Sequence, residues 1–147
     1  MTAKLLLTTG ALLSFTIALM HVMMIFIGAE AYRYFDAGQE MVDGALSGSM
    51  RPTIVTLGVT AFLTLFGVYA LSGAGWIKSL PLLKPALWLI GGIYTLRGLG
   101  LFAQIGMLAM GQSGDHLAPK DLVFSLVSLL IGIIYLLGTW KHTTPTT

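Results

Sequence analysis

The chain has 147 residues, of which 56% are hydrophobic and 10% are charged, and its net charge is +2. Soluble globular domains carry about 25% charged residues, so this composition excludes an ordinary soluble domain and indicates a membrane protein. The basic residues form no cluster, which argues against nucleic-acid binding. Cysteine is absent, which excludes disulfide bonds, thiol catalysis and thiolate metal sites.

Two membrane helices are predicted in the first half of the chain. The first covers about residues 5–28. This run is longer than the apolar core of a secretory signal, about 7–15 residues, so we expect a retained helix rather than a cleaved signal. A polar stretch over residues 30–51 follows, and its beginning could extend the first helix beyond the membrane. The second helix is predicted over residues 53–72, because Pro52 suits a first helical position and Gly73 opens a glycine-rich stop.

Two more helices are predicted in the second half. Pro85 opens the third, over about residues 85–110. This segment is longer than the roughly 20 residues that span a bilayer, so it should tilt or project from the membrane. A short loop over residues 112–118 is expected next, and Pro119 starts the fourth helix, over residues 120–140.

These spans predict an all-α polytopic membrane protein, an antiparallel four-transmembrane-helix bundle that forms one domain over residues 1–147. One side of the membrane receives lysines and no acid: Lys4, Lys78, Lys84 and Lys141. The other side receives Arg33, Arg51 and Lys120 together with all the acids: Glu30, Asp36, Glu40, Asp43, Asp115 and Asp121. The positive-inside rule makes the lysine side cytoplasmic. We therefore expect a protein of the cell membrane or an inner membrane, with both termini on the cytoplasmic side and residues 30–51 on the outer side.

Small and hydroxyl residues form stripes at helical spacing. On the third helix the stripe is Gly91, Thr95, Gly98 and Gly106, and on the fourth it is Ser125, Ser128, Gly132, Tyr135 and Thr139. Such stripes let membrane helices pack closely, and their hydroxyls can bond back to their own helix. A polar pathway through the bundle is the alternative, and we favour packing.

Arg97 is the most unexpected residue, because it stands near the middle of the third apolar segment. Intramembrane arginines pair with an acid or line a wet cavity. Gln104 shares its helical face, and Tyr94 lies beside it. The preferred partner is Glu30, and Asp115 and Asp121 are alternatives. Arg97 either fixes the helix register through an ion pair or a cage of carbonyl groups, or forms a site for an anion, a lipid head group or a quinone.

His21 is the second candidate group, within the first span. A hydrogen bond to another helix is the favoured interpretation. Proton transfer and haem ligation in a symmetric oligomer are alternatives. Glu30 is nine residues away and faces oppositely on a straight helix, unless the helix bends near Gly28.

Methionines near His21 raise a third possibility, a copper site. The candidate ligands are Met20, His21, Met24 and Met107. Thioether and imidazole groups suit Cu(I). Methionine also fills gaps in apolar packing, and we favour that interpretation.

The sequence therefore predicts a small non-enzymatic membrane protein, an accessory or ligand-binding subunit with a polar site around Arg97, Glu30 and His21. The alternatives are a small-molecule or ion-coupled transporter, and a membrane enzyme acting on a lipid or quinone. No metalloprotease, hydrolase, Walker or dinucleotide-binding motif is present, and no cofactor is identified. The expected partners are membrane lipid and a second copy or larger membrane complex, with no nucleic acid.

Overall fold

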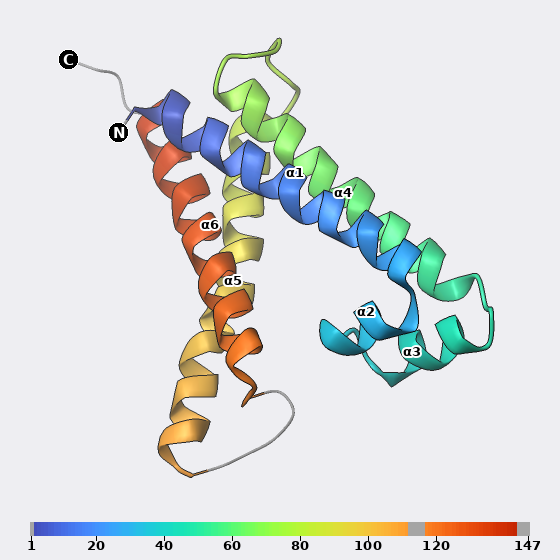
Figure 1. Cartoon of the computed structure of the whole chain (residues 1–147). Helices are drawn as coiled ribbons and strands as arrows, with labels where there is room; N and C mark the ends of the chain where they lie inside the picture. The colour runs from blue at the N-terminus through green and yellow to red at the C-terminus, as the bar shows by residue number, and fades with distance from the viewer. Residues whose placement is uncertain (1, 112–116, 144–147) are drawn as a thin grey trace. The chain divides into compact units, whose positions relative to one another are not determined.

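The computed structural model describes residues 2–111 and 117–143 and is helical, without strands, over these ranges (Figure 1). The predicted all-α class is confirmed. In chain order the helices are α1 (Ala3–Ile27), α2 (Ala29–Tyr34), α3 (Gln39–Leu46), α4 (Arg51–Gly73), α5 (Leu83–Ala109) and α6 (Pro119–Thr143).

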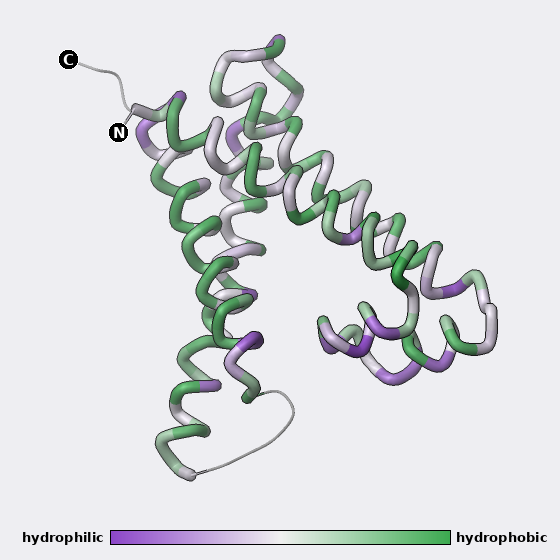
Figure 2. The backbone as a smooth tube through the Cα atoms, viewed as in Figure 1, coloured by the Kyte–Doolittle hydropathy of each residue, from purple (hydrophilic) through white to green (hydrophobic). Residues whose placement is uncertain are grey.

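The four long helices α1, α4, α5 and α6 are long and apolar enough to cross a membrane. Their ends lie within three residues of the predicted span ends. Figure 2 shows that hydrophobic residues dominate these helices, whereas hydrophilic residues concentrate in α2 and α3. Most of the predicted loop over residues 112–118 falls outside the described residues.

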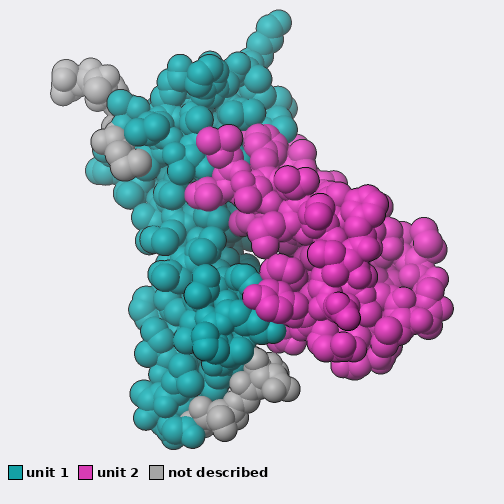
Figure 3. Space-filling view, viewed as in Figure 1, with its two compact units in different colours: residues 1–11, 68–147 teal, residues 12–67 magenta. Residues whose placement is uncertain are grey.

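The chain divides into two compact units (Figure 3). Unit 1 contains residues 1–11 and 68–147, and unit 2 contains residues 12–67. Helices α1 and α4 each contribute to both units. The positions of the units relative to one another are not determined, so a single four-helix bundle stays a prediction.

Unit 1 is built on α5 and α6, which pack side by side in opposite directions (Figure 1). Gly98 lies directly against the backbone of Leu129, and Gly132 lies directly against Thr95. A methyl group at either glycine would overlap the facing helix. Because small residues allow this approach and the dispersion contacts that come with it, the predicted packing role is confirmed at Thr95, Gly98 and Gly132, whereas a methyl group at Gly106 of the same stripe would meet no neighbour within 4 Å in the described residues.

The first turns of α1 also belong to unit 1. Leu7 is fully buried, and its side chain fills the space beside Gly73 and Gly138. The hydroxyl of Tyr135, which is also fully buried, donates a hydrogen bond to the carbonyl of Gly10 at 3.4 Å. These contacts fix the N-terminal part of α1 against α4 and α6 within the unit.

A second set of contacts holds the start of α1 to the connection between α4 and α5. The indole N–H of Trp76 donates a hydrogen bond to Thr8 Oγ1 at 2.9 Å. Lys4 Nζ lies 4.5 Å from the centroid of the Trp76 ring, within the range of a cation–π interaction.

In unit 2, α1 ends at Ile27 and is followed by Gly28. The backbone angles of Gly28, φ 80° and ψ −140°, are accessible to glycine but strained for other residues. The chain therefore turns into α2 instead of extending the first helix. A small apolar cluster ties α1, α2 and α3 together. Its buried members are Met24, Ala31, Tyr32 and Val42, with Ala29, Phe35, Met41 and Ala45 packed around them.

Helix α4 packs against α1 and α2 within unit 2. The hydroxyl of Tyr32 lies 3.1 Å from Thr56 Oγ1, and both side chains are buried. Gly67 leaves room for the ring of Phe15, which a methyl group would meet at 2.6 Å. The hydroxyls of Thr60 and Thr64 donate to carbonyls four residues earlier, at 2.8 Å each, so they are bonded within their own helix.

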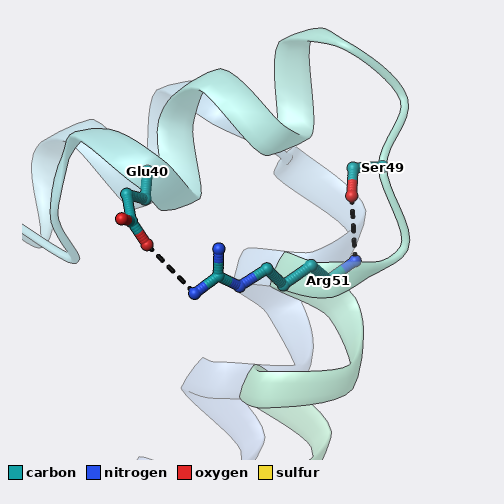
Figure 4. A network of polar contacts seen from close by, with 3 residues as sticks. All are labelled: Glu40, Ser49 and Arg51. Carbon is teal, nitrogen blue, oxygen red and sulfur yellow. Dashed lines mark hydrogen bonds and ion pairs between the residues drawn. The ribbon is translucent and has the colours of Figure 1, made fainter.

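The junction between α3 and α4 carries an ion pair (Figure 4). Arg51 lies 3.1 Å from Glu40, and the Arg51 backbone N–H donates to Ser49 Oγ at 3.2 Å. Both charged side chains are more than two-thirds exposed, at 71% and 80%. Exposed ion pairs contribute about 0–1 kcal/mol to the free energy of unfolding, so this pair contributes little to the stability of unit 2.

Candidate functional site

Arg97 lies in the middle of α5, and its side chain is exposed. Within the described part of unit 1, its guanidinium has no ion pair or hydrogen bond. The charge therefore stands on a helix of membrane-spanning length without a partner among the described residues of its own unit. Since an unpaired charge in a membrane costs at least about 2.5–3.5 kcal/mol on insertion scales, something outside these residues should neutralise it.

The acid of unit 1 that the structure describes is Asp121, in the first turn of α6. Gly100 faces Ser125, so the antiparallel register places Asp121 level with Gln104. That level is seven residues from Arg97, or about 10 Å along the helix. Asp121 Oδ2 is buried and has no hydrogen-bond partner among the described residues. The other alternative partner, Asp115, lies outside the described residues.

The two predicted neighbours of Arg97, Tyr94 and Gln104, are more buried than Arg97 itself. Tyr94 is buried and stacks on Tyr135, with ring centroids 5.8 Å apart. Its ring therefore contributes to the packing of α5 on α6, whereas the Arg97 side chain is exposed. Gln104 is half-buried.

His21 is half-buried in α1, and its Nδ1 lies 2.8 Å from the carbonyl oxygen of Ile17. A carbonyl oxygen only accepts hydrogen bonds, so Nδ1 carries the proton and donates it. The expected hydrogen bond exists, but it stays within the helix instead of reaching another one. Nε2 is the ring nitrogen left to accept a bond from a further group.

Glu30 is exposed in the first turn of α2, where a negative charge is favourable next to the helix N-terminus. The break at Gly28 separates it from α1, so the bend considered in the sequence is present. Glu30 and His21 belong to unit 2, and Arg97 belongs to unit 1. Because the units are not placed relative to one another, the pairing of Arg97 with Glu30 stays a prediction.

The methionines of α1 line a pocket of about 250 Å³ within unit 2. Its lining residues are Thr16, Leu19, Met20, Met23, Met24, Ile27 and Phe35. The structure thus brings two of the four predicted copper ligands, Met20 and Met24, to one surface and adds Met23. His21 is not part of this lining, and Met107 lies in α5 of unit 1.

The sequence predicted the methionine cluster but not the pocket, because one lining residue, Phe35, follows α2 and lies beyond the break at Gly28. Gly28 predicts a turn in the sequence, but it does not predict on which side of α1 the chain continues. In the described residues, no three His, Asp or Glu side chains are close enough to hold a metal ion.

Each unit has its own candidate feature. Unit 1 has an exposed cation on a long apolar helix, and unit 2 has an apolar pocket lined by thioethers. Comparisons with protein-family models, curated proteins and solved structures find no match for the chain.

Proposed function

We propose that the protein is an integral membrane protein whose four long helices cross the bilayer in alternating directions, with both termini in the cytoplasm. The support is the length and apolar character of α1, α4, α5 and α6. The lysine-only side of the sequence supplies the orientation, because cytoplasmic loops are enriched in lysine and arginine. In this arrangement α2 and α3 lie on the outer side.

The proposed topology can be tested with single cysteines, because the native chain has none. A cysteine at Ser47, an exposed residue after α3, should react with an impermeant maleimide in intact cells. A cysteine at Ser79, an exposed residue between α4 and α5, should react only after the cells are lysed. The reversed pattern of labelling would overturn the orientation.

Within this topology, the protein acts as a non-enzymatic accessory or ligand-binding subunit whose ligand is held by Arg97, in the outer half of the membrane. The observation that carries the proposal is the exposed Arg97 guanidinium, which has no partner in the described part of unit 1. A planar guanidinium binds carboxylate or phosphate groups through two parallel hydrogen bonds. The ligand is therefore an acidic amphipathic molecule, or an acidic group of a membrane partner.

Native mass spectrometry of the gently extracted protein tests this proposal. We expect wild type to retain an acidic small molecule and the Arg97→Gln variant to lose it. Arg33→Gln is the matched control, because Arg33 is an exposed arginine of unit 2 outside the proposed site. Equal adducts on wild type and Arg97→Gln would argue against a ligand at Arg97.

A second comparison separates a bound ligand from an ion pair inside the chain. If Glu30 neutralises Arg97, the Arg97→Leu variant should lose about 3–5 kcal/mol of stability and the double variant with Glu30→Leu should recover most of it. No recovery in the double variant would exclude the pair. Flux in proteoliposomes lost with Arg97, or turnover lost with His21→Ala, would instead favour the transporter or the enzyme.

A further inference from the structure

The pocket of unit 2 is built from one face of α1 and closed by Phe35, the residue that follows α2. Met20, Met23 and Met24 have the spacing of neighbours on one helix surface, where side chains three and four residues apart meet. Met24 is 6% exposed and lies deepest, whereas Met20 and Met23 are 40% and 52% exposed. The three flexible thioether side chains thus line the same pocket, with Met24 at its buried end and Met20 and Met23 nearer its opening.

The other lining groups offer little to a polar ligand. Thr16 Oγ1 already donates its proton to the carbonyl of Leu12 at 2.9 Å. The remaining side chains are Leu19, Ile27 and Phe35, which carry only hydrocarbon. No charged side chain, amide or imidazole is among the lining residues. An anion or a hydrogen-bonding ligand would therefore be desolvated in this pocket without compensation.

The three sulfur atoms change what the pocket can bind. A hydrocarbon chain would be accommodated equally well by leucine or isoleucine, which do not explain three thioethers in one lining. Thioethers are soft ligands that favour Cu(I), whereas hard cations require oxygen ligands that the lining lacks. The Thr16 hydroxyl, which is already bonded to Leu12, is the one side-chain oxygen in the lining, so the lining offers no strong oxygen or nitrogen ligand to compete with the thioethers.

We propose that Met20, Met23 and Met24 form a Cu(I) site, with Phe35 covering one side of the pocket. The site differs from the set expected from sequence, because His21 is bonded to Ile17 and does not line the pocket. It lies wholly in unit 2 and does not depend on Arg97. Failure of the copper site and failure of the acidic-ligand site are therefore distinguishable.

The test is a Cu(I) competition with a coloured chelator on the purified, full-length protein. We expect wild type to hold one Cu(I) per chain. Met23→Leu combined with Met24→Leu should weaken retention by at least about tenfold. The substitutions conserve volume, so the fold should survive them. The matched control is Met50→Leu combined with Met110→Leu, two exposed methionines that do not line the pocket, and it should bind like wild type.

X-ray absorption and pH identify the ligands. Thioethers carry no proton to lose, so Cu(I) affinity should stay constant between about pH 7 and about pH 5, where a histidine ligand would become protonated. Sulfur-only coordination supports the site. Nitrogen coordination, a loss of affinity on acidification, or equal binding by the pocket variant and its control would overturn the proposal. A lipid chain found in the pocket in place of copper would overturn it as well.

Discussion

Replacement of Gly98 by alanine is expected to destabilise the protein by about 1–3 kcal/mol or more, because the new methyl group would overlap the backbone of Leu129. A flexible side chain could move aside, but a helix backbone cannot do so without separating α5 from α6. Each 1.4 kcal/mol corresponds to about a tenfold change in the folding equilibrium, so the effect should be measurable in a denaturant titration of the protein in detergent.

Two other glycines of α5 provide matched controls for Gly98. At Gly92 and Gly106 an added methyl group meets nothing within 4 Å. Alanine is a better helix former than glycine by about 1 kcal/mol, so these two variants should be neutral or slightly stabilised. If Gly98→Ala behaves like them, α5 and α6 do not pack as closely as the structure shows.

Replacement of Tyr32 by alanine should have the largest effect in unit 2, about 3–5 kcal/mol by analogy with other buried aromatic residues. Tyr32 is 2% exposed and belongs to the cluster that joins α1, α2 and α3. Its hydroxyl also contacts Thr56 of α4. The loss of the ring should therefore release α2 and α3, which faster proteolysis of residues 36–50 would report.

Smaller substitutions divide this effect into its parts. Tyr32→Phe keeps the ring and removes the hydrogen bond, which should cost about 0.5–1.5 kcal/mol. Tyr34→Ala serves as the control, because that ring is 56% exposed and its edge-to-face contact with Phe35, at 5.0 Å between centroids, should be worth only about 0.5–1.5 kcal/mol. A Tyr34→Ala variant as damaged as Tyr32→Ala would mean that the cluster is not the core of unit 2.

The long helices were predictable because their start and stop signals are local. Pro119 begins α6, and Gly73 ends α4, as expected from the fixed φ of proline and the freedom of glycine. For the polar stretch over residues 30–51 the sequence predicts at most an extension of the first helix, whereas the structure has two separate helices there, α2 and α3. Both are short, and they depend on a tertiary cluster around Tyr32 that no local pattern reveals.

The candidate site was predictable only as a set of residue types. Arg97 stands out by composition, but its partner depends on tertiary structure, and the register of α5 on α6 places Asp121 about two turns away. His21 was expected to bond across helices, yet the carbonyl of Ile17 on its own helix is nearer. The pocket required Phe35, which is placed by the backbone angles of Gly28 and not by the helical spacing of the methionines.

The contacts of Trp76 give the protein a built-in optical reporter. Its indole is bonded to Thr8 and lies beside the Lys4 ammonium, so its fluorescence should respond when the start of α1 detaches. With Trp88 and Trp140 replaced by phenylalanine, the remaining emission would come from this one position. The undocking of the N-terminal turn could then be followed separately from the unfolding of the rest of the chain, without an added dye.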